Sequence, residues 1–134
     1  MQVVNIILYV IVIAVLLYWG GSWLYYRYQG KKLGGEISQK EFESSMRKAQ
    51  IVDLREKSNF DSKHILGARN LPYSQLKYVE GDLRPDLPVY LYDERKNTCI
   101  RAALKFKKWG FTDVKWMEDR FTDWTGKTKK TTKI

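Results

Sequence analysis

The one cysteine of the chain, Cys99, is the residue best suited to nucleophilic chemistry. It lies in the stretch YDERKNTCIRAAL, where an apolar, β-rich run gives way to a helical pattern, so we expect it in the first turn of a helix. The helix dipole and the nearby Arg95, Lys96 and Arg101 would favour the thiolate there. Because the thiolate is the form that attacks sulfur, Cys99 is a candidate nucleophile.

The helical spacing around Cys99 indicates a second, structural role. Cys99 shares one face of the predicted helix with Ala102, Ala103 and Phe106, while basic residues fill the opposite face. Such a face packs on a sheet, and free cysteine is among the most buried residue types. We therefore interpret Cys99 as a buried residue, with the nucleophile as the alternative.

The sequence contains a single histidine, His64. One histidine and one cysteine cannot form a metal site by themselves, and we see no P-loop, dinucleotide fingerprint or Ser-His-Asp order. We therefore predict no metal and no cofactor.

Strands and helices alternate along the soluble part of the chain. Short apolar runs predict strands at 51–54, 68–71, 89–92 and 114–117. Helical patterns occur between them, and the clearest helix is predicted to have Thr98 as its N-cap and to end at Gly110. This order predicts a parallel sheet with helices on both faces. Ligands of such sheets bind beyond the carboxyl ends of the strands, which is where the loop from Asp93 to Thr98 falls.

The first part of the chain is predicted to cross a membrane. Val3 to Leu24 has no charged side chain and would span about 33 Å as a helix. Tyrosines and tryptophans gather at its distal end, and Arg27, Lys31 and Lys32 follow. A cleavable signal peptide would carry its basic residues before the apolar run, so we favour an anchor. The positive-inside rule then places the N-terminus outside and the rest of the chain in the cytoplasm.

We divide the chain into four parts by composition. They are a transmembrane anchor with its interfacial flank (1–28), a Gly- and Lys-rich linker (29–35), one α/β domain (36–126) and a basic tail (127–134). The formal net charge is +9. Next to an anionic membrane leaflet this charge favours membrane lipid as a partner, and we expect no nucleic-acid binding because no nucleic-acid motif is present.

Several local motifs occur together in a familiar order. Val52-Asp53-Leu54-Arg55 is followed by the run His64 to Ala68, HILGA, then by the helix around Cys99 and by Trp124. Over residues 36–126 this order resembles the rhodanese-like (sulfurtransferase) domain family, although Leu66 replaces the proline usual in the second motif. The resemblance implies a three-layer α/β fold with a parallel sheet and helices on both faces. It also implies structural roles for a set of motif residues, namely Asp53, Arg55, His64 and Gly67.

The resemblance also locates the loop that carries activity in such domains. Active members have a cysteine directly after the strand and an arginine closing a six-residue loop, and these positions fall here on Asp93 and Thr98. A carboxylate cannot accept a sulfane sulfur, because persulfide chemistry needs a thiolate. The equivalent loop consists of Asp93, Glu94, Arg95, Lys96, Asn97 and Thr98.

Two functions of different class follow from these residues. The first is a membrane-anchored cytoplasmic rhodanese-like domain without sulfurtransferase activity, which binds a protein or a small anionic partner through Arg95 and Lys96. The second is a thiosulfate sulfurtransferase or persulfide carrier that uses Cys99. A weaker third hypothesis is a relative of arsenate reductases or dual-specificity phosphatases, against which the absent cysteine and arginine count equally.

Overall fold

The structure, a computed structural model, describes residues 2–78 and 80–131. A five-stranded sheet forms the centre of the domain, and every neighbouring pair of its strands is parallel. In spatial order its strands are β1 (Glu36–Ile37), β6 (Val114–Met117), β5 (Val89–Tyr92), β2 (Gln50–Asp53) and β4 (Arg69–Asn70). A separate antiparallel pair joins β3 (His64–Ile65) to β7 (Thr128–Lys129).

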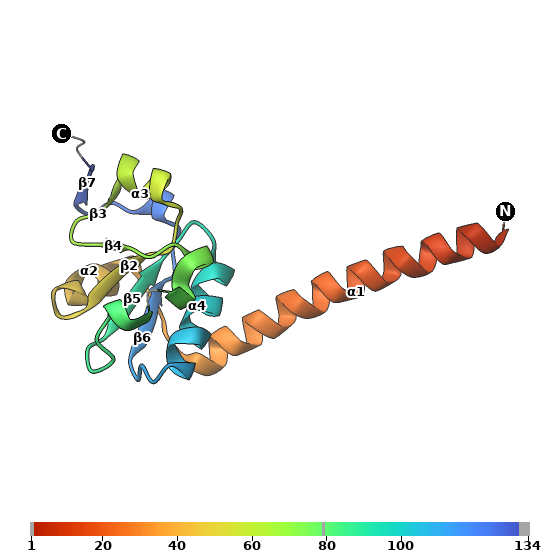
Figure 1. The fold of residues 1–134 in the computed structure, drawn as a ribbon, viewed down its shortest axis with the longest axis horizontal. Helices are drawn as coiled ribbons and strands as arrows, with labels where there is room; N and C mark the ends of the chain where they lie inside the picture. The colour runs from red at the N-terminus through yellow and green to blue at the C-terminus, as the bar shows by residue number, and fades with distance from the viewer. Residues whose placement is uncertain (1, 79, 132–134) are drawn as a thin grey trace.

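Helices surround this sheet, as Figure 1 shows. The α-helices of the domain are α2 (Gln39–Ser45), α3 (Lys57–Ser62) and α4 (Lys96–Lys108). The 3-10 helices are η1 (Met46–Lys48), η2 (Tyr73–Tyr78), η3 (Glu80–Asp82) and η4 (Phe121–Asp123). The predicted α/β class is therefore confirmed.

Strand β5 contributes side chains to two separate hydrophobic cores, one on each face of the sheet. Val89 and Leu91 belong to the core that α4 covers with Phe106, and the alternate residues Tyr90 and Tyr92 belong to the opposite core. Phe42 of α2 packs in this second core, and Ser38 caps α2 by accepting the Glu41 N–H at 3.2 Å. Burial on both faces explains why β5 reads as a continuous apolar run.

Helix α4 begins earlier than the sequence pattern predicts. Its N-cap is Arg95, so Thr98, the predicted N-cap, lies inside the first turn, and that prediction was wrong. The Asp93 carboxylate accepts the Arg95 N–H at 2.9 Å, which turns the chain directly after β5 and lets the helix start at Lys96. The predicted end is confirmed, because Gly110 follows the helix with a φ of 98°.

Helix α1 (Gln2–Leu33) continues through most of the segment expected to be a linker. It ends at Leu33, directly before Gly34, which adopts a φ of 64°. Its last turns contact the domain: Tyr26 and Leu33 pack against the core beneath α4. Figure 1 shows the rest of α1 extending away from the domain as a single rod. Gln2–Gln29 is long and apolar enough to cross a membrane.

The expected basic tail, 127–134, is partly included in the fold. Strand β7 pairs His64 with Lys129 and Ile65 with Thr128, and the Thr131 N–H donates to the Asp61 carbonyl at 2.9 Å. The remaining three positions of the tail lie outside the described residues. The domain therefore extends beyond residue 126, its expected end.

Candidate functional site

The loop between β5 and α4 borders a small cavity, which we call the loop pocket. The cavity measures about 210 Å³. It lies between this loop and the chain that follows β6, at the carboxyl ends of two neighbouring strands. Its lining residues are Asp93, Glu94, Lys96, Cys99, Met117, Glu118, Asp119 and Arg120.

Asp93 occupies the point where β5 ends. Its side chain is half-buried and its Oδ2 accepts the Arg95 N–H at 2.9 Å, while its carbonyl accepts the Phe121 N–H at 3.3 Å. Burial raises the pKa of the Asp93 carboxyl, and the hydrogen bond from Arg95 opposes that rise only in part. The Asp93 carboxylate thus occupies one backbone N–H of the loop, which is no longer free to bind an external anion.

Cys99 lies beneath this loop and is only 1% exposed. Burial raises the pKa of its thiol well above the ordinary value, and the negative charge of Asp93 raises it further. Two of the three basic residues expected to favour a thiolate are engaged elsewhere, and the third, Arg95, is exposed at the loop tip. Lys96 pairs with Glu36 at 2.9 Å, and the Arg101 guanidinium lies 4.4 Å from the centre of the Tyr26 ring. The thiol is therefore neutral and shielded, in contrast to a reactive cysteine.

The rim of the loop pocket is acidic. Its carboxylates outnumber its basic side chains by two to one, and Arg120 lies 3.5 Å from the Asp123 carboxylate outside the pocket. Glu94 accepts a hydrogen bond from the Thr122 hydroxyl at 2.7 Å, which joins the two loops that form the rim. An anion entering this pocket would meet like charge, so the pocket is poorly suited to a thiosulfate ion.

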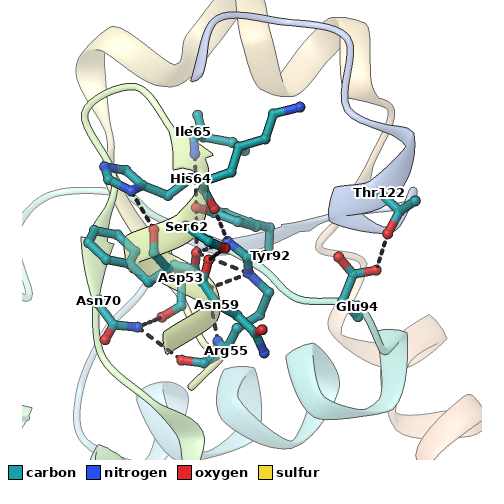
Figure 2. A network of polar contacts seen from close by, with 12 residues as sticks. Asp53, Arg55, Asn59, Ser62, His64, Ile65, Asn70, Tyr92, Glu94 and Thr122 are labelled. Carbon is teal, nitrogen blue, oxygen red and sulfur yellow. Dashed lines mark hydrogen bonds and ion pairs between the residues drawn. The ribbon is translucent and has the colours of Figure 1, made fainter. Parts of the chain in front are cut away.

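A second polar group lies at the end of the neighbouring strand β2. Asp53 is fully buried and pairs with Arg55, with Oδ2 and Nη2 2.8 Å apart. The Asp53 Oδ1 accepts the Arg55 N–H at 2.8 Å, and its Oδ2 accepts the Tyr92 hydroxyl at 2.7 Å. Figure 2 shows Arg55 and Tyr92 converging on Asp53, with Glu94 and Thr122 to one side. We call Asp53, Arg55 and Tyr92 the strand-end network.

The charge of Arg55 is held in place from several sides. Burial opposes that charge, but the hydrogen bond and the attraction of Asp53 outweigh burial and raise the Arg55 pKa. The guanidinium also donates to the Lys63 carbonyl and lies 4.0 Å from the centre of the Phe121 ring. Burial likewise raises the pKa of the Tyr92 hydroxyl, which accepts the Ile65 N–H at 3.1 Å.

The remaining motif residues shape the loop that follows α3. The His64 ring stacks on Phe60 with 3.8 Å between centroids, and its Nδ1 donates to the Phe60 carbonyl at 2.7 Å. Gly67 has a φ of 89°, a conformation that favours glycine. Asn70 donates to the carbonyls of Asp53 at 3.3 Å and Arg55 at 2.9 Å. These contacts connect the motif to the strand-end network.

Sequence reasoning missed Tyr92 as part of this network and the contacts of Asn70 with it. The signal for Tyr92 was its place on β5, where it alternates with Leu91 and so points to the opposite face. Among residues 2–78 and 80–131, no group of three or more His, Cys, Asp or Glu side chains is arranged to hold a metal ion.

Comparisons with known proteins agree with this geometry. The family model described as "Rhodanese-like domain" matches residues 38–127. The "Uncharacterized protein YqhL" of Bacillus subtilis (strain 168) is 39% identical over 125 residues, which is 93% of this chain and 96% of that protein. The "Thiosulfate sulfurtransferase GlpE" of Shewanella oneidensis is 32% identical over 75 residues, which is 56% of this chain and 74% of that protein.

Solved structures share the fold. The crystal structure of the BH2092 protein from Bacillus halodurans superposes with a TM-score of 0.66 at 23% identity and covers 80% of this chain and 85% of that one. At this identity the match shows the fold alone.

Proposed function

The chain belongs to the rhodanese-like domain family, and we propose that it is a membrane-anchored member that serves as a binding module and lacks sulfurtransferase activity. The observation that carries this proposal is the carboxylate of Asp93 at the end of β5, bonded to the loop's own Arg95 N–H. Because one similar protein is named a thiosulfate sulfurtransferase, sulfur transfer from thiosulfate is the activity to test.

The chemistry of sulfur transfer argues against the loop as a catalyst. A persulfide forms when a thiolate attacks the outer sulfur of thiosulfate and sulfite leaves with the bonding electron pair. Asp93 offers oxygen rather than sulfur, and Thr98 lies within α4 without the positive charge that would hold the anionic donor. The acidic rim of the loop pocket would further oppose that donor.

Cys99 is the alternative site of sulfur transfer, and its surroundings weigh against it. The thiol is almost completely buried, and its raised pKa keeps it protonated at neutral pH. A thiosulfate ion would have to pass the Asp93 carboxylate to reach it, since both residues line the loop pocket. The persulfide-carrier hypothesis therefore requires an anionic donor to enter the loop pocket past this carboxylate.

The proposed binding role uses the tip of the loop. Arg95 is exposed and, within the part of the chain that the structure describes, forms no ion pair. Lys96, the other basic residue expected to contact a partner, is bonded to Glu36 and would have to exchange that carboxylate for one from the partner. We propose a protein or a small anion as the partner, with Arg95 as its main contact.

The proposed anchor is α1. Its charge-free part is exposed on all sides in the structure, and Arg27 follows it directly, which supports a single span with the N-terminus outside and the domain in the cytoplasm. Covering this surface with lipid would remove a large apolar area from water.

A sulfur-transfer assay tests the proposal. The full chain in detergent should transfer no sulfur from thiosulfate to cyanide above a control without protein. Replacing Asp93 by Cys together with Thr98 by Arg places the thiol and the positive charge in the loop, and we expect this double variant to gain activity. Asp93→Ser with Thr98→Arg is the matched control, since it removes the carboxylate without supplying a thiol.

Intact-protein mass spectrometry separates the two hypotheses for Cys99. After incubation with thiosulfate, the unmodified chain should gain no sulfur atom. A gain that disappears in Cys99→Ser, accompanied by cyanide-dependent turnover, would establish the carrier and refute the binding module.

A further inference from the structure

A second and larger cavity lies where α1 joins the domain. It measures about 490 Å³ and is separate from the strand-end network. Three elements border it: the end of α1, the first turn of α4 and the edge of the sheet at β1 and β6. Figure 1 shows that this junction is the place where the long α1 rod reaches the domain. The lining residues are Trp23, Arg27, Gly34, Glu36, Lys96, Asn97, Ile100 and Trp116.

The charges of this junction cavity leave a net positive site. Glu36 and Lys96 neutralise each other in an ion pair with 2.9 Å between Oε1 and Nζ. Arg27 is the remaining charged lining residue, and its guanidinium lies 5.1 Å from the centre of the Trp23 ring. A guanidinium held over an aromatic face is well placed to bind a phosphate with two parallel hydrogen bonds.

Two further groups add hydrogen-bond donors. Lys96 and Asn97 form the first turn of α4, a helix of 13 residues, where backbone N–H groups have no partner within the helix. Trp116 lines the cavity as well, and its Nε1 is buried without an acceptor among the described residues. Buried indole N–H groups normally have a partner, so the Trp116 N–H is a donor that the described part of the chain leaves unsatisfied beside this cavity.

The location indicates where such an acceptor would come from. Trp23 and Arg27 lie at the distal end of the predicted membrane span, where tryptophan and arginine meet lipid headgroups. We propose that the junction cavity binds the phosphate headgroup of an anionic glycerophospholipid. This inference rests on the membrane anchor of the proposed function. Arg27 and the first turn of α4 hold the phosphate, while Trp23 and Trp116 contact the glycerol.

A bound headgroup would join the two parts of the molecule. Arg27 belongs to α1, and Asn97 belongs to the helix that follows the loop pocket. The lipid would therefore fix the domain against its anchor and bring the first turn of α4 close to the membrane surface.

Native mass spectrometry of the full chain tests this site. The chain in detergent micelles is mixed with equal amounts of phosphatidylglycerol and phosphatidylcholine, and the lipid retained per chain is measured. We expect the unmodified chain to retain phosphatidylglycerol at least about fivefold more than phosphatidylcholine, which is the effect of one well-placed basic group. Equal retention of the two lipids would overturn the proposal.

Three variants separate a defined binding site from diffuse charge attraction. Arg27→Gln should abolish the preference, and Arg47→Gln, which removes the same charge from an exposed position on η1, should retain it. Asn97→Phe fills the cavity without changing the charge, and it too should abolish the preference, with folding verified by circular dichroism. If Asn97→Phe kept the full preference, the attraction would arise from surface charge and the site would be refuted.

Two control arms identify the source of the phosphate and isolate the anchor. Inorganic phosphate offered at the same concentration should leave phosphatidylglycerol in place; its retention in preference to the lipid would overturn the choice of a headgroup. Extraction of native membranes with alkaline carbonate tests the anchor alone, because a chain released by it is not integral. An integral chain without lipid preference would refute only the headgroup site.

Discussion

The ends of β2 and β5 carry the same three-residue pattern with different outcomes. Asp53-Leu54-Arg55 follows one strand and Asp93-Glu94-Arg95 follows its neighbour, and in each the aspartate accepts the N–H of the arginine two residues later. At β2 the arginine side chain also returns to its aspartate, whereas at β5 it extends into solvent.

The difference lies in what surrounds each carboxylate. Asp53 is fully buried, and Arg55 and Tyr92 satisfy its oxygens. Asp93 is half-buried, receives one backbone hydrogen bond, and has a raised pKa. A buried charge contributes to a fold only when it is fully compensated, so the β2 pattern supports the structure while the β5 pattern leaves charge at the mouth of a pocket.

Removing the Asp53 charge should have the largest effect. Asp53→Asn leaves the Arg55 guanidinium buried without its counter-ion, which we expect to destabilise the domain by about 3–5 kcal/mol. Thermal unfolding of the full chain in detergent, followed by near-UV circular dichroism, measures the loss. A loss below about 1 kcal/mol would show that solvent reaches Arg55 and that the two strand ends are equivalent.

The matching change at the other strand should act in the opposite direction. Because burial raises the folded-state pKa of Asp93, its ionised form weakens the fold at neutral pH, and this penalty disappears as the pH falls through that pKa. Asp93→Asn keeps an oxygen that can accept the Arg95 N–H, so we expect stabilisation at pH 7, limited to about 0.5 kcal/mol because solvent screens the partly exposed carboxylate. Stability curves measured from pH 7 to pH 3 should converge for the variant and the unmodified chain.

The arginine of the β5 pattern should matter least to folding. Arg95→Gln removes an exposed side chain and should change stability by no more than about 0.5 kcal/mol. The same variant should weaken binding to whatever protein co-purifies with the intact chain from membranes. A destabilisation as large as that of Asp53→Asn would remove Arg95 as a partner contact and give it a structural role.

Periodicity predicted the central fold well because the central strands are long enough to show it. The runs at 89–92 and 114–117 became β5 and β6, and Gly110 ended α4 as expected. Three of the four two-residue strands, β1, β3 and β7, were missed, since a pair of residues carries no alternation, whereas the fourth, β4, lies within the apolar run predicted at 68–71.

The departures from prediction have tertiary causes. Thr98 has a side chain suited to an N-cap, but the bond from Arg95 to Asp93 starts α4 earlier. The linker composition favoured flexibility, yet Tyr26 and Leu33 pack on the domain and keep the segment between them helical. The burial of Cys99 followed from its helical face. The contacts that engage Lys96 with Glu36 and Arg101 with Tyr26 could not be predicted from sequence spacing.

The unbroken helix α1 keeps the domain at a short distance from the end of the proposed membrane span. From Arg27 to Leu33 the helix rises by only about 9 Å, which is close to the Debye length at physiological ionic strength. In the proposed arrangement the domain is held close to the bilayer surface and meets its partner by diffusion in the plane of the membrane. Its encounters would then depend on lateral diffusion and on the surface density of other membrane proteins, and only slightly on their concentration in the cytosol.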